Sequence, residues 1–325
     1  MKKILLTTFL AVVVAGLVAL PAAGTTRGKN GPILYSRFGQ MLWTVNPDGT
    51  GARKLPHVPR TLEDNPDWSP NGTRIAFDRC KTNCEVWTTR ADGTHGTRLG
   101  PDCLDRPDTA CEDRTVPAWS PNGKQLAFGW GSKAIKDGVH ESTEIYVANT
   151  NGTGLRQVTH MTADAPYTMD VNKPAWSPDG KRLVFEVQNL ATADPPNRRA
   201  IFIVNVDGSG LRQLTDWSLN GGDDPDWSPD GKRILFRAVS TAESHSGNLY
   251  TVAPDGSKLT QLTHYPLRKT VLLGSFSPDG QWIVFSRFNK TAYPAIYVMR
   301  ADGTELHRVM QDNLTYSPDW GPLWA

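Results

Sequence analysis

Short runs of apolar residues recur along the chain, and polar turn residues separate them. The run Lys181–Phe185 is followed, after a loop, by Ala200–Val204 and then by Leu211–Leu214. Runs of four or five residues that are rich in Val, Ile and Phe are typical of β-strands. Asp207-Gly208, between the second run and the third, is a hairpin signal. This stretch therefore predicts consecutive antiparallel strands.

A five-residue phrase, Trp-Ser-Pro-(Asp or Asn)-Gly, recurs ahead of such strands. It begins at Trp68, Trp119, Trp176, Trp227 and, with Phe in place of Trp, Phe276; Asp319-Trp320-Gly321-Pro322 is a partial sixth copy. Pro sets the φ angle of a tight turn and Gly accepts positive φ, so the phrase predicts a turn between two strands. Repetition with a period of about 50 residues is typical of a propeller or another repeat array.

The two ends of the chain complete one another. Each full repeat predicts a four-stranded antiparallel meander, which is a propeller blade. Ile33–Tyr35, Leu42–Thr44 and Arg53–Leu55 match the second, third and fourth strands of a repeat, with no first strand before them. At the other end, Trp320 begins a first strand. We therefore expect an all-β, six-bladed β-propeller over residues 31–325, with the ring closed by N- and C-terminal strands in one blade.

The N-terminal segment has the layout of an export signal. Lys2 and Lys3 precede the apolar run Ile4–Leu20, and small residues follow. This pattern predicts a signal peptide over residues 1–24 and a short tail over residues 25–30. The alternative is an uncleaved membrane anchor, because the run approaches the minimum length of a membrane span. We expect a periplasmic or extracellular protein that leaves the membrane after cleavage.

The charge of the chain argues against nucleic acid as a partner. The formal net charge is +2, and loss of the two leader lysines leaves none. Binding to phosphate backbones needs a basic face. We expect a protein partner instead, and a monomeric chain.

The four cysteines, Cys80, Cys84, Cys103 and Cys111, lie close together in the sequence. Export favours disulfides, and four cysteines allow three connectivities. We predict Cys80–Cys84 and Cys103–Cys111, because each pair closes a local loop. The alternative is a zinc site, since the first spacing is tolerable for a metal; the absence of a Cys-x-x-Cys pair counts against it.

The candidate binding residues follow from the lengths of the connections. In a meander, alternate connections share a face, so the short Ser-Pro-Asp-Gly and Asp-Gly turns lie on one face and the longer connections lie on the other, where function concentrates. The predicted binding residues there are His160, Asp216, Trp217, Asp223, Asp224, His264 and Tyr265. If the His and Asp side chains converge, they would form a metal or acid–base cluster. The interpretation that we favour is that Thr159-His160, Thr215-Asp216 and Thr263-His264 cap loop entries by hydrogen bonding.

The repeated phrase, followed by Ile-Tyr and then Asp-Gly, resembles the propeller repeats of the TolB family over residues 31–325. The resemblance implies a six-bladed extracytoplasmic propeller that works by protein–protein contact at the cell envelope, with a lipoprotein as one kind of partner. We expect the chain to lack the N-terminal α/β domain of that family. Similar repeats occur in oligogalacturonate lyases and beside the hydrolase domains of prolyl-oligopeptidase-like peptidases.

The chain carries no Gly-x-Ser-x-Gly elbow, His-Glu-x-x-His helix or phosphate-binding loop. We predict a non-enzymatic interaction module at the cell envelope, with no catalytic residue, metal or cofactor. The alternative is a polysaccharide-processing enzyme like oligogalacturonate lyase, or a carbohydrate-binding protein. A converging His, Asp, Gln and Arg cluster at the channel mouth would favour the lyase. A shallow face with exposed aromatic side chains would favour the interaction module.

Overall fold

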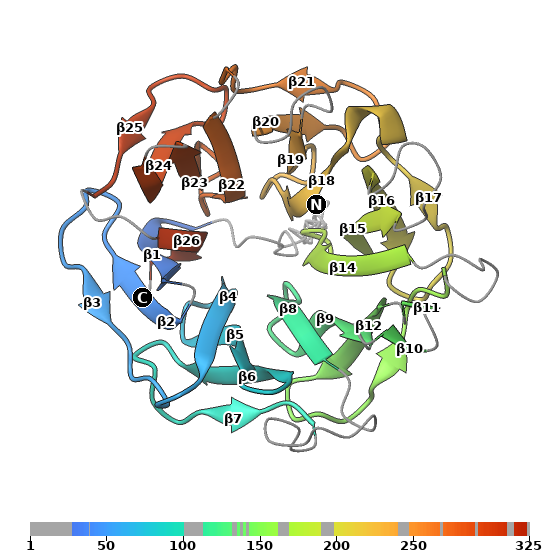
Figure 1. Cartoon of the computed structure of the whole chain (residues 1–325), viewed down its shortest axis with the longest axis horizontal. Helices are drawn as coiled ribbons and strands as arrows, with labels where there is room; N and C mark the ends of the chain where they lie inside the picture. Colours follow the sequence, from blue (N-terminus) through green and yellow to red (C-terminus); the bar gives the residue numbers. More distant parts are fainter. Residues whose placement is uncertain are drawn as a thin grey trace, which may run out of the picture.

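The protein is a β-propeller with almost no helix (Figure 1). The computed structural model describes residues 28–38, 40–100, 113–131, 135–136, 139–140, 143–161, 169–189, 198–239, 247–266, 269–289, 292–310 and 315–323. Antiparallel sheets stand around a central axis, and one short 3₁₀ helix, η1 (Trp217–Leu219), follows an outer strand. The predicted all-β fold and propeller arrangement are confirmed.

Four of the sheets contain four antiparallel strands each. The first is β26 (Thr315–Pro322), β1 (Asn30–Arg37), β2 (Met41–Val45) and β3 (Arg53–Lys54). The second is β4 (Leu62–Trp68), β5 (Arg74–Cys80), β6 (Cys84–Arg90) and β7 (Thr97–Arg98). The third is β8 (Asp113–Trp119), β9 (Gln125–Gly131), β12 (Glu144–Asn149) and β13 (Arg156–Gln157). The fourth is β14 (Met169–Trp176), β15 (Arg182–Asn189), β16 (Arg198–Asn205) and β17 (Arg212–Gln213).

The remaining large sheet has eight strands and consists of two meanders. One is β18 (Gly221–Trp227), β19 (Ile234–Val239), β20 (Gly247–Val252) and β21 (Thr260–Gln261). The other is β22 (Lys269–Phe276), β23 (Trp282–Asn289), β24 (Ala292–Arg300) and β25 (His307–Arg308). A parallel pairing of Gly247 with Thr270 joins them. A small ribbon of β10 (Ile135–Lys136) and β11 (Val139–His140) lies between β9 and β12 in the chain. Because two meanders share one sheet, sheet pairing alone leaves the blade count of six as a proposal.

The Ser-Pro-Asp-Gly phrase forms the turn that the sequence predicts. The Ser177 hydroxyl donates to Asp179 Oδ1 (2.6 Å) and accepts from the backbone N–H of Arg182 (2.9 Å). Gly180 has a φ of +68°, which a residue without Cβ adopts freely. The Asp of the phrase therefore belongs to the turn that joins β14 to β15.

Apolar clusters fill the space between neighbouring meanders. Val184 and Ile201 of one sheet pack with Trp227 and Ile234 of the next, and all four are buried. Six such clusters lie within the described residues, each between two successive meanders. The phrase Trp is thus a core residue that packs one meander on another.

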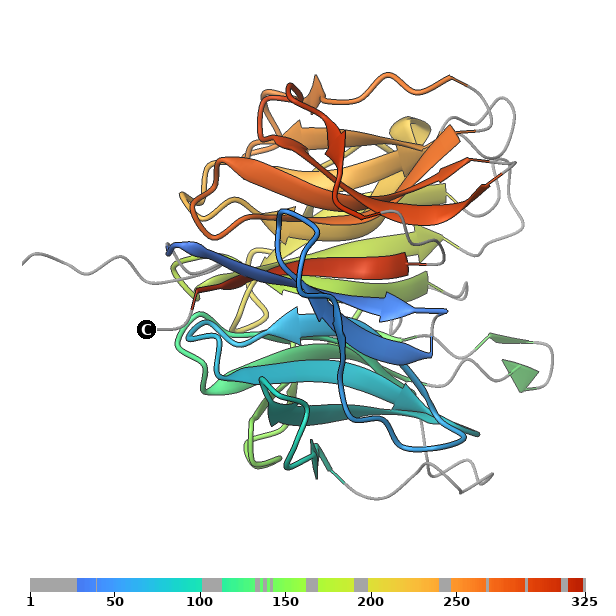
Figure 2. The same cartoon turned by 90° about the vertical axis from the view of Figure 1, so that its left-hand side faces the viewer.

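The strands run between two faces of the molecule (Figure 2). The connections β14–β15 and β16–β17, and their equivalents in other meanders, are the Ser-Pro-Asp-Gly and Asp-Gly turns, and we call their side the short-turn face. The connections β15–β16 and β17–β18, and their equivalents, lie on the opposite side, which we call the long-loop face.

The two ends of the described chain share one sheet. β26 pairs antiparallel with β1, and Ile33 lies opposite Trp320 (Figure 1). One detail of the prediction is wrong: Trp320 does not begin this strand but lies near its end, since β26 starts at Thr315. In each repeat, the innermost strand leads up to the Trp rather than away from it.

Candidate functional site

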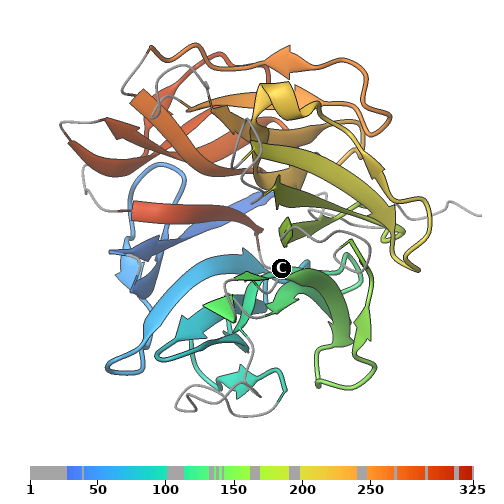
Figure 3. The same ribbon diagram turned by 45° about the vertical axis from the view of Figure 1, so that its right-hand side comes forward.

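The innermost strands enclose a central cavity of about 120 Å³. Residues of β4, β8, β14, β18, β22 and β26 line it, so the cavity is the channel of the propeller (Figures 1 and 3). Side chains of these six strands therefore decide what the channel can hold.

The register of all six lining strands shifts, and five of the strands share one kind of β-bulge. In each, a non-glycine residue with positive φ stands directly before a proline, and the strand register shifts there: these residues are Asn65, Val116, Lys173, Asp224 and Ser317. A bulge redirects the side chains beside it. All five residues line the channel, so the bulges create a ring of unlike side chains on one scaffold.

Three further carboxyl groups line the channel and link successive meanders. Asp319 accepts the backbone N–H of Trp68 (2.8 Å), Asp67 accepts that of Trp119 (2.6 Å), and Asp226 accepts that of Phe276 (2.7 Å). Each contact joins an innermost strand to the next one around the ring.

Burial makes these carboxyl groups weak acids. It raises the pKa of Asp226 to about 7 and that of Asp319 to about 6. Burial, followed by repulsion from Asp319, raises the pKa of Asp67 well above its usual range. The hydrogen bond that each carboxylate accepts from a backbone N–H favours ionisation, but desolvation has the larger effect on the pKa.

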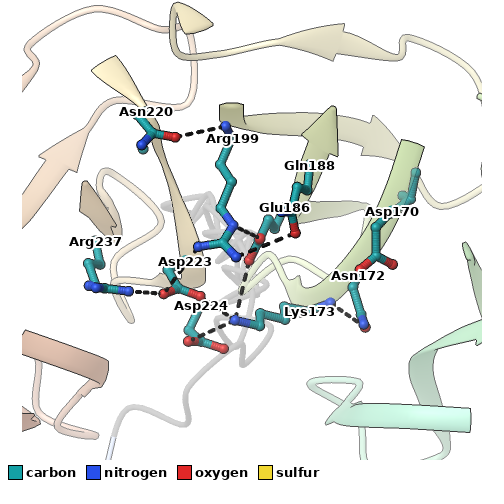
Figure 4. A network of polar contacts seen from close by, with 12 residues as sticks. Asp170, Asn172, Lys173, Glu186, Gln188, Arg199, Asn220, Asp223, Asp224 and Arg237 are labelled. Atoms are coloured by element: carbon teal, nitrogen blue, oxygen red, sulfur yellow. Dashed lines mark hydrogen bonds and ion pairs between the residues drawn. The ribbon is translucent and has the colours of Figure 1, made fainter. Parts of the chain in front are cut away.

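A buried network of charged side chains lines the wall of the channel between two sheets (Figure 4). At its centre, Lys173 Nζ bonds Asp223 and lies 3.3 Å from both Glu186 Oε2 and Asp224 Oδ2. Arg237 bonds the same Asp223 carboxylate from β19. Lys173 and Glu186 come from the sheet of β14–β17, so the network bridges that sheet to β18 and β19.

A third cation, Arg199, joins the network from the strand beside Glu186. Arg199 Nε lies 2.8 Å from Glu186 Oε1, and Arg199 Nη1 lies 3.9 Å from Asp223 Oδ2. Its backbone N–H donates to Asn220 Oδ1 (3.1 Å), which fixes it against the chain that leads into β18. The network therefore holds three cationic and three carboxyl side chains, and their charges balance when all three carboxyl groups are ionised.

The pKa values within the network diverge. Burial, opposed by Lys173, raises the pKa of Glu186 from 4.5 to about 7 and that of Asp224 from 3.8 to about 6. Burial also acts on Asp223, but Lys173, Arg237 and Arg199 together outweigh it and hold the pKa of Asp223 well below its usual range. For Lys173, three carboxylates outweigh burial and raise the pKa. Asp223 is therefore the fixed anion of the group, whereas Glu186 and Asp224 titrate near neutrality.

The predicted binding residues fall into two separate places. Asp223 and Asp224 lie in β18 beside the channel. His160, Asp216 and His264 are exposed, and each follows an outermost strand. The innermost and outermost strands lie at opposite edges of a meander (Figure 1). The structure therefore does not bring the His side chains and Asp216 to Asp223 and Asp224, and among the described residues no group of three or more His, Cys, Asp or Glu side chains could hold a metal ion.

The threonine before each exposed residue has a repeated structural role. Thr159, Thr215 and Thr263 accept, through Oγ1, the backbone N–H of Ile145, Ile201 and Leu249, each at 2.9 Å. Asp216 accepts the N–H of Ser218 and caps η1. These contacts match the capping interpretation.

The two aromatic candidates are half-buried beside outer strands. Trp217 lies against the Phe202 ring, with 5.8 Å between the ring centroids. Tyr265 accepts from Arg287 Nη1 (3.4 Å), and its backbone N–H donates to Asn248 Oδ1 (2.7 Å). Both side chains retain solvent-facing surface at the long-loop face.

Sequence reasoning missed Lys173, Glu186, Arg199 and Arg237. A signal was available for three of them. Lys173 occupies the position before proline that recurs in five innermost strands. Glu186 and Arg237 both follow the Phe of a second strand, where Asp78 stands in another repeat. Asp78 Oδ2 accepts from Asn65 Nδ2 (2.7 Å), which is the same register relation that places Glu186 beside Lys173.

The disulfide Cys80–Cys84 is present, as predicted. Cys103 and Cys111 lie outside the described residues, so their pairing stays a prediction. No described helix has the length and apolar character of a membrane span.

Comparison with curated proteins identifies TolB-like propeller repeats. The Tol-Pal system protein TolB of Francisella tularensis is 24% identical over 297 residues, which cover 89% of this chain and 61% of that protein. An uncharacterized peptidase of Bacillus subtilis, YuxL, is 28% identical over 220 residues, which cover 54% of this chain and 29% of the peptidase. The chain thus spans less than two thirds of the length of these relatives. No family model matches it.

Solved structures share the fold. TolB from Acinetobacter baumannii superposes with a TM-score of 0.66 at 18% identity, covering 90% of this chain and 67% of that one. A putative TolB from Agrobacterium tumefaciens gives 0.62 at 18% identity, covering 90% and 99%. An oligogalacturonate lyase in complex with manganese gives 0.54 at 12% identity, covering 88% and 86%. The chain carries TolB-like propeller repeats, and its fold is also that of a lyase.

Proposed function

We propose that the protein is an exported, six-bladed propeller that binds another protein at the cell envelope through its long-loop face. Each meander, including the two in the eight-stranded sheet, counts as one blade in this proposal. The six apolar clusters between successive meanders support that count, because a blade packs on its neighbours through such clusters. The chain acts as a monomer and needs no cofactor.

The observation that carries the proposal is the balanced charge network in the channel wall. Lys173, Arg199 and Arg237 engage Glu186, Asp223 and Asp224 among themselves. Carboxylates that are already paired with cations in the folded protein are poor metal ligands, because metal binding would have to break those pairs first. A channel wall whose cations and carboxylates engage one another supports a binding scaffold.

Location and partner class follow from two further observations. The leader pattern of residues 1–24 and the disulfide Cys80–Cys84 support export to an oxidising compartment. The similarity to TolB over 89% of the chain supports contact with an envelope protein, and a lipoprotein is one candidate class.

A comparison of the two faces tests this function. The purified chain would be used to capture a partner from envelope extract, and affinity would then be measured for variants. We expect the triple variant His160→Ala, Asp216→Ala, His264→Ala and the double variant Trp217→Ala, Tyr265→Ala to fold normally and to weaken binding. The matched control is Asp207→Ser in a short-turn hairpin, which should bind like wild type. Weaker binding for the control alone would contradict the proposal.

A second assay separates binding from sugar chemistry. The chain would be incubated with pectic and other acidic oligosaccharides, with and without manganese, and the release of unsaturated sugar followed by ultraviolet absorbance. We expect no release. Metal-dependent release that the His160→Ala, His264→Ala variant abolishes would replace our proposal with a lyase.

A further inference from the structure

Three large apolar side chains are exposed on neighbouring connections. Phe38 is 48% exposed, Val58 42% and Leu62 47%, and we call these three residues the apolar patch. Four other exposed leucines occur once in each of four successive meanders, at the same repeat position, and a fifth lies just after β26: Leu155, Leu211, Leu259, Leu306 and Leu323. Isolated exposed leucines are ordinary, whereas a group of apolar side chains marks an interaction site.

Backbone contacts hold the members of the patch together. The N–H of Glu63, next to Leu62, donates to the carbonyl of Gln40 (3.2 Å), in the same turn as Phe38. The Thr61 hydroxyl donates to the carbonyl of Val58 (2.8 Å). These turns are the connections β1–β2 and β3–β4, which both belong to the long-loop face. The patch therefore spans two adjacent meanders on that face.

The surroundings of the patch are rigid. Phe38 has a φ of +61°, a strained conformation for an aromatic residue, and the Arg37 guanidinium lies over its ring, 5.5 Å from the centroid. Leu62 lies opposite Cys80, which the disulfide fixes to Cys84. A preformed surface loses little conformational entropy when it binds a partner.

The fully exposed charge beside the patch is positive. Arg60 is exposed, whereas Glu63 is buried. Glu63 accepts two hydrogen bonds from the guanidinium of Arg79, at 2.8 Å and 3.0 Å. Asp64 is half-buried and accepts a backbone N–H. On the two connections of the patch, the fully exposed charge among the described residues is the positive charge of Arg60, which complements an acidic group on a partner.

We propose that the apolar patch docks a segment of a partner protein that combines apolar with acidic side chains. This inference rests on the proposed function, since it names the partner chemistry of the long-loop face. The apolar side chains of the segment would cover Phe38, Val58 and Leu62, and an acidic side chain of the segment would face Arg60. The patch lies outside the channel, so its occupant need not enter the propeller.

A random twelve-residue peptide library displayed on bacteriophage tests the proposal with the full chain as bait. We expect the selected peptides to carry net negative charge together with aromatic or aliphatic residues. The dissociation constant of a selected peptide, measured by fluorescence anisotropy, should rise at least tenfold for Phe38→Ser, Leu62→Ser and for Arg60→Glu, because truncated anchors and reversed charge remove central contacts. The matched control is Leu155→Ser, Leu211→Ser, which removes two leucines of similar exposure and should leave affinity unchanged.

The other outcomes overturn the proposal in recognisable ways. Selected peptides that are neutral or basic, or that bind the Phe38→Ser, Leu62→Ser variant like wild type, would place docking elsewhere while leaving the protein-binding role intact. Binding of vesicles that contain phosphatidylglycerol, lost in the same variant while peptide binding persists, would make the occupant a lipid surface. Self-association in sedimentation, lost in that variant, would make it a second copy of the chain. Near-ultraviolet circular dichroism verifies that each variant is folded.

Discussion

Asp223 contacts three cationic side chains at once, so its removal should lower the free energy of unfolding more than removal of an exposed acid does. In Asp223→Ala, the largely buried Lys173 and Arg237 lose this counter-charge. Breaking a buried ion pair on one side costs about 3–5 kcal/mol, and we expect a loss of that size in the free energy of unfolding. Urea unfolding at pH 8 measures it. Asp216→Ala, at an exposed cap, is the control and should lose less; equal losses would mean that the network does not stabilise the fold.

Glu186 should make a contribution to stability that decreases as the pH rises from about 4.5 to about 7. Its pKa is about 7 in the folded state against 4.5 for an ordinary Glu, so the folded state binds more protons than the unfolded state between those values. Stability contributed by this group is complete below about pH 4.5 and is lost as the pH rises toward 7. We expect Glu186→Gln to flatten this decline, as measured by urea midpoints between pH 4.5 and pH 8. An unchanged slope would contradict the assignment.

At the residue scale, sequence alone located only part of the site. Asp223 and Asp224 were predicted, but their partners Lys173, Glu186 and Arg199 were not. These residues are separated along the chain and meet only because two meanders pack side by side. A repeat predicts that positions are equivalent, whereas contact between unlike residues at those positions depends on packing between blades.

At the element scale, the carboxyl groups that join successive innermost strands act as hydrogen-bond acceptors more than as charges. Asp226 accepts the N–H of Phe276, and burial raises its pKa to about 7. Asn in its place keeps an acceptor oxygen and removes the buried charge. We therefore expect Asp226→Asn to be more stable than wild type at pH 8 and equal to it at pH 4.

Thermal unfolding at the two pH values decides this prediction. Asp226→Ala is the matched control, because it removes the acceptor together with the charge and leaves the backbone N–H of Phe276 unsatisfied. It should be less stable than Asp226→Asn at both pH values. A loss of stability for Asp226→Asn at pH 8 would show that the ionised form is needed.

Elements were predicted better than contacts, because their signals are local. The Ser-Pro-Asp-Gly turn, the Asp-Gly hairpin and the strands between them depend on residues a few positions apart. The bulge before each proline was missed, since a non-glycine residue at positive φ has no strong local signature. The strand boundary at Trp320 was predicted wrongly, because the inner strand precedes the phrase and begins at Thr315.

At the scale of the whole molecule, the ring depends on contacts between its two ends. β26 pairs with β1, Trp320 packs in a cluster with Ile33 and Tyr35, and Asp319 accepts the N–H of Trp68 in the next sheet. One strand therefore contributes sheet pairing, core packing and an inter-sheet hydrogen bond. The repeats predicted this closure because the N-terminal repeat lacks its first strand and the C-terminal segment supplies one. No knowledge of a long-range contact was needed.

Removal of residues 315–325 should consequently destabilise the entire propeller. Loss of Trp320 alone, as in Trp320→Ala, leaves a cavity worth about 3–5 kcal/mol, and the deletion removes strand pairing as well. We expect a lower thermal midpoint and a broader transition for the deletion than for Trp320→Ala.

The control is a circular permutant in which a short linker joins the two ends and the chain is opened at Asp207-Gly208, an exposed hairpin. The backbone N–H of Leu323 already donates to the carbonyl of Lys29 (2.7 Å), so the ends are close enough for such a linker. This permutant keeps every strand and should unfold near the wild-type midpoint; a deletion variant as stable as the permutant would disprove closure through β26.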